Sequence, residues 1–256
     1  MFPRPWNLAG ASEASTRVAR FPYDRAQGVT VTIPLKDTIP SRTFPIVSVS
    51  LIVVNVAVFI YEVALGHGVN SFIMQNGLIP AGITGGGEAA GIPFKPYTLF
   101  TSLFLHGGWL HVGGNMLFLW IFGDNVEDRL GHVRFLIFYL LCGVAASLTH
   151  VVANPASTMP TIGASGAIAG VLGAYLVLYP RAKVLTLLPL GFYIQVVQVP
   201  AFLFLGFWFL LQFVVGAASL SAGAAKEGVA WWAHVGGFGA GAALQFVFRK
   251  RGGEWA

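Results

Sequence analysis

The chain has 256 residues, of which only 10% are charged and 55% are hydrophobic, and its formal net charge is +5. Soluble domains carry about 25% charged residues, so this composition excludes an ordinary soluble protein and predicts an integral membrane protein. The positive charge follows no basic stripe with interleaved aromatic residues, which argues against nucleic-acid binding, and the single cysteine, Cys142, excludes an internal disulfide.

The N-terminal 42 residues predict a polar tail on the cytoplasmic side of a membrane. They contain six lysines and arginines, several prolines and no apolar run that could act as a signal peptide. We expect this tail, residues 1–42, to be flexible and uncleaved, and residues 251–256 to form a short C-terminal tail.

Six apolar stretches lie between these tails, within residues 43–250. A helix needs about 20 apolar residues to cross ~30 Å of hydrocarbon, and Pro200 should bend the fifth stretch because proline interrupts helical hydrogen bonding. The first connection is too rich in glycine and proline, from residue 78 to 97, to be one regular helix. The sequence therefore predicts an all-α membrane protein, a bundle of six transmembrane helices in a lipid bilayer. The expected spans are 45–65, 109–122, 133–152, 165–179, 194–215 and 229–248.

The distribution of positive charge predicts the orientation of these spans. All but two of the 15 lysines and arginines lie in the N-terminal tail, after the second span, after the fourth span or in the C-terminal tail. The two exceptions are Lys95 and Lys226. Because cytoplasmic segments hold the excess of Lys and Arg, both termini should face the cytoplasm.

Four polar side chains should then meet at one depth in the outer leaflet. Ser165 opens the fourth span, and His234 lies near the start of the sixth. His111 and Asn115 lie in the first turns of the second span. Taken alone, Ser165 is typical of a small packing residue. Each of the other three, taken alone, is typical of a residue that makes a hydrogen bond between helices. Unpaired polar groups are costly in lipid. Four of them at one depth are therefore better explained by a shared functional site than by separate packing roles.

This set is sufficient for nucleophilic catalysis. A serine hydroxyl becomes a nucleophile when an imidazole accepts its proton, which predicts Ser165 as the nucleophile and His234 as the base. His111 and Asn115, spaced i and i+4, share a helix face and could form an oxyanion hole with the Ser165 backbone N–H. Because no Asp or Glu is expected at this depth, we infer a dyad rather than a triad. A neutral imidazole is needed, so activity should fall on acidification.

Glycines favour close packing around this site. Gly163 and Gly166 should let backbone approach the nucleophile, and Gly237 and Gly241 form a GxxxG face that begins three residues after His234. The complementary small face of the fourth span should bring His234 within hydrogen-bond reach of Ser165. That face consists of Gly166, Gly170 and Gly173.

Other polar residues are expected to support the structure. His106 should bond the first outer loop, and Glu127 and Arg129, two residues apart, should bind loop backbone at the inner end of the second span. No metal or other cofactor is expected, since HExxH is missing and no outer-leaflet carboxylate is expected to complete a zinc site.

These residues resemble the rhomboid intramembrane serine proteases over roughly residues 43–250. The resemblance implies a six-helix protease domain, with the first loop partly in the membrane and a water-filled cavity that opens outward. It also implies the roles given above for Ser165, His234, His111 and Asn115, an acyl-enzyme intermediate, and single-span transmembrane proteins as substrates, cut near the outer face. The motifs are His106-Gly-Gly-Trp-Leu-His111-Val-Gly-Gly-Asn115, Glu127-Asp-Arg129-Leu-Gly131, Gly163-Ala-Ser165-Gly166, and Ala233-His234-Val-Gly-Gly237 with Gly241.

Two departures from the family pattern bear on how His234 is held and how the first loop lies. Ala169 stands where some members have an aromatic residue that stacks on the histidine, and Pro96-Tyr97 stands where many have Trp-Arg. They support a second hypothesis, a non-catalytic rhomboid-like protein that binds membrane clients. A small-solute transporter ranks last because the chain shows no inverted repeat. Six spans with little extra domain suit a bacterial inner membrane.

Overall fold

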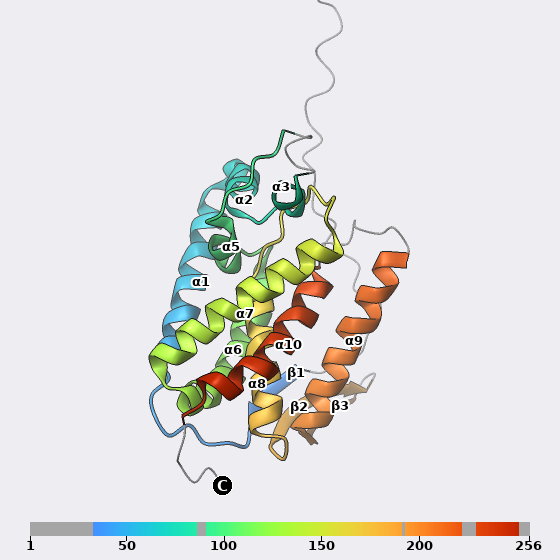
Figure 1. The fold of residues 1–256 in the computed structure, drawn as a ribbon. Helices are drawn as coiled ribbons and strands as arrows, with labels where there is room; N and C mark the ends of the chain where they lie inside the picture. Colours follow the sequence, from blue (N-terminus) through green and yellow to red (C-terminus); the bar gives the residue numbers. More distant parts are fainter. Residues whose placement is uncertain (1–32, 86–90, 191–192, 222–228, 251–256) are drawn as a thin grey trace, which may run out of the picture.

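The computed structural model describes residues 33–85, 91–190, 193–221 and 229–250. The predicted tails therefore lie outside the described residues from 1 to 32 and from 251 to 256, as does Lys226. Each of the six predicted stretches contains a helix (Figure 1). These helices are α1 (Ile46–Ala64), α6 (Trp109–Leu130), α7 (His132–Ala153), α8 (Ser165–Leu178), α9 (Ala201–Ser221) and α10 (Trp231–Phe248).

Three of the described helices are long and apolar enough to cross a membrane by length and composition, namely Ile46–Ala64, His132–Ala153 and Ala201–Ser219. Helices α6 and α8 differ from these three in charge and in length. Helix α6 carries four charged residues in its last seven positions, and α8 has only 14 residues. The protein is thus a largely helical membrane bundle in which the helices have unequal lengths.

Helix α8 is enclosed by the other helices. Residues 166–175 are all buried, and α7 and α10 cross in front of α8 while α1 and α9 flank the bundle (Figure 1). A helix that is apolar on every side must lie inside a bundle, which explains why α8 can be short. Its first residue, Ser165, follows a segment that bonds to the first loop, since the Gly163 N–H donates to the Ser102 carbonyl.

The first loop forms short helices at one end of the bundle, called the loop end below (Figure 1). A bridge between Leu78 and Thr161 ties this loop to the segment that precedes α8. The sequence correctly excluded one regular helix here, because glycines and prolines divide the loop. Its elements are η1 (Gly66–Gly68), α2 (Val69–Asn76), α3 (Pro80–Thr84), α5 (Thr98–Thr101) and η2 (Ser102–Phe104).

A three-stranded antiparallel sheet at the opposite end, the sheet end, corrects the all-α prediction (Figure 1). Its order is β1 (Ile33–Asp37), β2 (Lys183–Leu190) and β3 (Tyr193–Pro200). Strand β1 lies in the stretch expected to be a flexible tail, and its Ile33 pairs with Leu187 of β2. The structure therefore places residues 33–37 of the expected tail in a sheet, where they pair with β2.

Strand β3 also corrects the predicted fifth span. Residues 194–200 were expected to begin a helix bent at Pro200, but they pair with β2 along its length. Their sequence, Ile194-Gln-Val-Val-Gln-Val-Pro200, is rich in β-branched residues, which favour strands. Pro200 ends the strand, and α9 begins at Ala201 without a bend caused by this proline.

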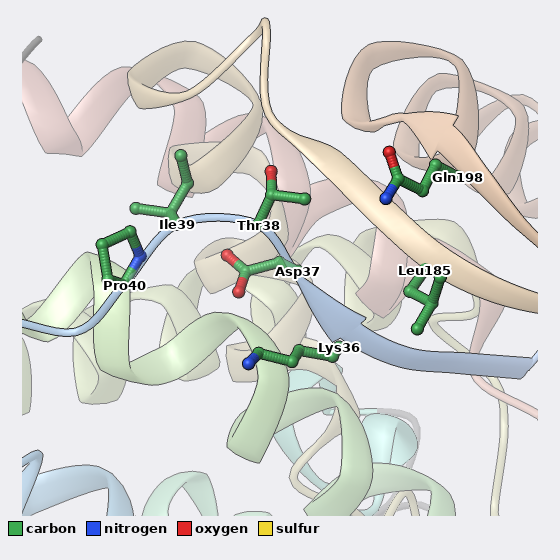
Figure 2. A pocket seen from close by; sticks show the side chains of 7 residues that line it. All are labelled: Lys36, Asp37, Thr38, Ile39, Pro40, Leu185 and Gln198. Carbon is green, nitrogen blue, oxygen red and sulfur yellow. The ribbon is translucent and has the colours of Figure 1, made fainter.

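Asp37 of β1 connects the sheet to α6 and α8 through two hydrogen bonds. Its Oδ2 accepts hydrogen bonds from the Tyr175 hydroxyl of α8, at 2.5 Å, and from Asn125 Nδ2 of α6, at 2.9 Å. Burial raises the pKa of the Asp37 carboxyl, and the bond from Tyr175 opposes this shift. A cavity of about 340 Å³ lies beside this strand, lined by Lys36, Asp37, Thr38, Ile39, Pro40, Leu185 and Gln198 (Figure 2).

Adjacent carboxylates at the C-terminal end of α6 bind the start of α1. Glu127 is fully buried and accepts bonds from the backbone N–H groups of Val47 and Ser48, at 2.9 and 2.7 Å. Asp128 accepts from the N–H groups of Arg42 and Thr43 and from the Thr43 hydroxyl. Glu127 thus binds the first turn of a helix rather than a loop, where its negative charge also complements the helix dipole, and its Oε1 lies 2.6 Å from His132 Nδ1.

Candidate active site

Ser165 is the first residue of α8 and is held in a sharply turned segment. Gly163, two residues earlier, has φ +123°, and its N–H donates to the Ser102 carbonyl at 2.8 Å. A Cβ at Gly163 would lie 2.7 Å from His111 Nε2 and 3.6 Å from Ser165 Oγ. Only glycine fits this position, because both the dihedral angle and the space exclude a side chain.

His234, in the first turn of α10, faces Ser165. Its Nε2 lies 2.8 Å from Ser165 Oγ, a normal hydrogen-bond distance between residues 69 positions apart. The His234 side chain is buried, whereas Ser165 is half-buried. The geometry therefore brings together a hydroxyl and an imidazole as the chemistry of a serine nucleophile requires.

Close helix packing makes this contact possible. A Cβ at Gly237 would lie 2.0 Å from the Gly166 carbonyl oxygen, and one at Gly241 would lie 1.9 Å from that of Gly170. A Cβ at Gly173 would lie 2.1 Å from the Phe238 carbonyl oxygen. Along these glycines α8 and α10 thus pack backbone against backbone.

His111 lies near Ser165, and Asn115 follows it by one turn on the same face of α6. His111 Nε2 borders the same small space beside Gly163 as Ser165 Oγ, and its Nδ1 accepts from the Gly107 N–H at 3.3 Å. The Asn115 side chain is buried, and its Nδ2 has no hydrogen-bond partner among the described residues. A buried donor without a partner is rare in native proteins and is available to bind a ligand oxygen.

His106 lies beside this group rather than within it. Its ring centroid is 5.1 Å from that of His111, and its backbone N–H points to the buried carboxylate of Glu62, with N–O distances of 3.2 and 3.3 Å. The sequence did not anticipate a carboxylate here, because Glu62 lies at the end of an apolar helix, distant from His106 along the chain. Glu62 contributes to holding the loop that precedes α6.

Arg129 contributes to the opposite end of the molecule. Its backbone carbonyl accepts from the Lys250 N–H at 3.2 Å, which ties the end of α10 to the end of α6.

Gln212 is the functional candidate that the sequence analysis missed. Its Oε1 lies 2.7 Å from His234 Nδ1, the ring nitrogen that faces away from Ser165. Trp208, one turn earlier on α9, places its ring 5.8 Å from that of His234. Ala169, at the position where some rhomboid proteases have an aromatic residue, is small and fully buried. An amide in the apolar sequence of α9 was the signal that could have identified it, because polar groups within membrane spans are commonly functional.

The cavity at the sheet end is remote from this group. Tyr175, which bonds Asp37 beside the cavity, follows Ser165 by ten residues of helix, or about 15 Å along the axis. The chemistry of the serine and histidine therefore belongs to the loop end.

Comparisons with known proteins identify the family of this chain. The Rhomboid domain matches residues 93–251, more than half of the chain and the part that contains all four polar residues. RHOMBOID-like protein 1 of Arabidopsis thaliana is 35% identical over 155 residues, which cover 60% of this chain and 35% of that protein. Rhomboid protease GluP of Bacillus subtilis is 44% identical over 80 residues, or 31% and 15% of the two chains.

A further relative is Inactive rhomboid protein 1 of Drosophila melanogaster, which is 34% identical over 86 residues, or 34% of this chain and 6% of that protein. The chain thus spans at most about a third of the length of these three relatives. The match over the serine, the histidine and the helices that carry them establishes the family. This chain belongs to the rhomboid family.

Proposed function

We propose that this protein is an intramembrane serine endopeptidase with a Ser165–His234 dyad. The observation that carries the proposal is the 2.8 Å contact between Ser165 Oγ and His234 Nε2 across two tightly packed helices. Serine hydroxyls in helices often bond their own backbone, so a hydroxyl directed at an imidazole favours catalysis.

The reaction proceeds by acyl transfer. Ser165 Oγ attacks the scissile carbonyl carbon while His234 Nε2 takes the hydroxyl proton, and the carbonyl oxygen becomes an oxyanion. Collapse of this intermediate breaks the C–N bond, and the imidazolium gives its proton to the leaving amine, which leaves an ester on Ser165. Water then attacks the ester with His234 as base, and the second product departs as a carboxylic acid.

His111 and Asn115 act on the oxyanion. His111 Nε2 and the unpartnered Asn115 Nδ2 are donors on one helix face, and the Ser165 N–H at the start of α8 has no intrahelical acceptor. Donors fixed before the reaction stabilise charge as it develops, without reorganisation. In the tautomer required for this role, His111 accepts at Nδ1 from Gly107 and donates from Nε2.

The substrates are single-span transmembrane proteins, cut within the bilayer near its extracytoplasmic face. In this proposal the protease domain covers residues 43–250, all six helices cross the membrane, and both termini lie in the cytoplasm. The described lysines and arginines support this orientation, since β1, β2 and the ends of α6 and α10 carry them while Lys95 lies at the loop end. A bacterial inner membrane remains our proposal for the source.

Active-site labelling tests the dyad. A fluorophosphonate should add covalently to Ser165 in purified protein, and intact mass should show one adduct on the wild type and none on Ser165→Ala. Ser147→Ala is the matched control, because Ser147 is a buried serine on α7, and it should label as the wild type does. An adduct of equal mass on Ser165→Ala would refute the nucleophile assignment.

The same assay separates the second candidate, a rhomboid-like protein that binds membrane clients without cutting them. The Drosophila relative, named as inactive, is the observation that keeps this candidate in view. Folded wild-type protein that takes no label would favour client binding over catalysis.

A further inference from the structure

His234 uses both ring nitrogens, and each faces a different helix. Nε2 lies 2.8 Å from Ser165 Oγ of α8, and Nδ1 lies 2.7 Å from Gln212 Oε1 of α9. Gln212 is 6% exposed and is the only amide or charged side chain in the sequence of α9. A single buried acceptor therefore holds the side of the ring that the proposed chemistry does not use.

The identity of this acceptor determines the tautomer of the ring. A neutral imidazole has one donor nitrogen and one acceptor nitrogen, and an amide oxygen can only accept. Nδ1 must therefore carry the proton that it donates to Gln212, which leaves the lone pair of Nε2 directed at the Ser165 hydroxyl. The other tautomer would bring the Nδ1 lone pair against the amide oxygen.

No other described group can perform this task. The titratable groups with an electrostatic effect on His234 are His111 of α6 and His150 of α7, and neither hydrogen bonds Nδ1. Trp208 and Trp231 contact the ring, with centroids 5.8 and 6.2 Å away, and limit its tilt without acting as acceptors. Among the described residues, Gln212 alone fixes the Nδ1 proton.

Gln212 also lies where α9 meets the rest of the bundle. Phe204, Trp208, Gln212 and Gly216 recur every fourth residue and are turned inward, whereas most residues between them are exposed. The rotation of α9 that buries this face therefore also aims the amide at His234.

We infer that Gln212 is a positioning residue that selects the His234 tautomer needed to accept the Ser165 proton. This inference rests on the proposed serine chemistry and adds a neutral third member to the dyad. The amide orients the ring but brings no charge to the imidazolium that forms during the reaction. A carboxylate at the same place would orient the ring and also stabilise the imidazolium, which gives the experiment its second variant.

The experiment compares Gln212→Met and Gln212→Glu in the full chain in detergent, with cleavage of a single-span test substrate across pH. Gln212→Met keeps the side-chain size and removes the acceptor, so kcat should fall about 10- to 100-fold with KM little changed, part of the ~10²–10⁴ that a positioned base contributes. Gln212→Glu should recover most of this kcat, and the acid limb of its profile should move about one pH unit upward. Gln245→Met is the matched control. It removes a buried amide of equal size on a different helix, α10, and should keep the wild-type kcat.

Each other result contradicts the inference. Wild-type kcat in Gln212→Met would show that the tautomer needs no support from α9. Equal losses of kcat in the Met and Glu variants, or an unmoved acid limb in the Glu variant, would reduce Gln212 to a packing role. Fluorophosphonate labelling of the wild type separates the two proposals: labelled protein with an unaffected Met variant overturns only the role of Gln212, whereas unlabelled protein overturns the serine chemistry as well.

Discussion

Asn115 offers the sharpest test at the residue scale, because its buried Nδ2 donor has no partner among the described residues. If it binds the oxyanion, Asn115→Ala should lower kcat by about 10²–10³ with little change in KM, since the interaction exists only in the transition state. Steady-state cleavage kinetics measure both constants. Asn55→Ala, which removes a buried asparagine of α1, is the control and should retain kcat. A rise in KM at constant kcat would instead assign Asn115 to substrate binding.

The buried carboxyl of Asp37 should make the stability of the protein depend on pH. Because its pKa is raised, the folded state binds this proton more tightly than the unfolded chain does. The contribution of Asp37 to stability is therefore complete below the ordinary pKa of 3.8 and declines as pH rises through the raised pKa. Asp37→Asn keeps an oxygen acceptor for Tyr175 and Asn125 and removes this dependence. Its thermal midpoint in detergent, relative to the wild type, should therefore increase from pH 4 to pH 8.

Asp37→Ala is the contrasting variant. Relative to Asp37→Asn, it leaves two buried donors without an acceptor and should lose about 1–3 kcal/mol at every pH, because neither variant titrates at this position. If the thermal midpoint of Asp37→Asn fell relative to that of the wild type as pH rises, the assigned effect of burial on the Asp37 pKa would be contradicted.

Much of the site could be predicted from residues whose positions follow from helix starts. Ser165, His111 and His234 each lie near the start of an expected helix, so the sequence predicts that they share one depth in the membrane. Gln212 and Glu62 could not be found this way, because each makes its contact from the later half of a helix. Such contacts depend on how helices rotate about their axes, which spacing along the chain does not specify.

At the scale of elements, the seam between α8 and α10 determines whether the dyad can form. Gly241→Ala would place a Cβ 1.9 Å from the Gly170 carbonyl oxygen, whereas a Cβ at Gly239 meets nothing within 4 Å. Gly241→Ala should lower stability by about 1–3 kcal/mol or more through overpacking and reduce cleavage by pushing α10 away. Gly239→Ala should change neither. Thermal unfolding and substrate cleavage are measured for both variants. Equal stability and equal cleavage rates in the two would contradict the close packing of α8 on α10.

The sheet shows where prediction of elements failed. Residues 183–200 are apolar enough to resemble part of a span, and a short apolar run cannot be assigned to helix or strand from periodicity alone. Strand β3 pairs with the adjacent β2 along its length, but the other partner of β2, β1, lies about 150 residues earlier, so the pairing of Ile33 with Leu187 is invisible to local patterns. The helices were predictable because their signals are local: long apolar runs with glycine, proline or charge at their ends.

At the scale of the whole molecule, the orientation in the membrane can be tested with single cysteines. The native Cys142 is fully buried, so a membrane-impermeant maleimide should react only with an added thiol. Met159→Cys, exposed at the loop end, should label in intact cells, and Pro40→Cys, exposed at the sheet end, should label only after the membrane is opened. The reverse pattern would place the dyad toward the cytoplasm and contradict the orientation inferred from positive charge.

The most direct test of the central claim is cleavage of a single-span test substrate by purified protein in detergent, with product mass locating the cut. Wild type and Ser147→Ala should cut one bond near the extracytoplasmic boundary of the substrate span, whereas Ser165→Ala and His234→Ala should not cut. The loss must occur in folded variants, as judged by thermal unfolding. Cleavage of the same bond by Ser165→Ala would contradict the account, because no other described residue pairs a nucleophile with His234.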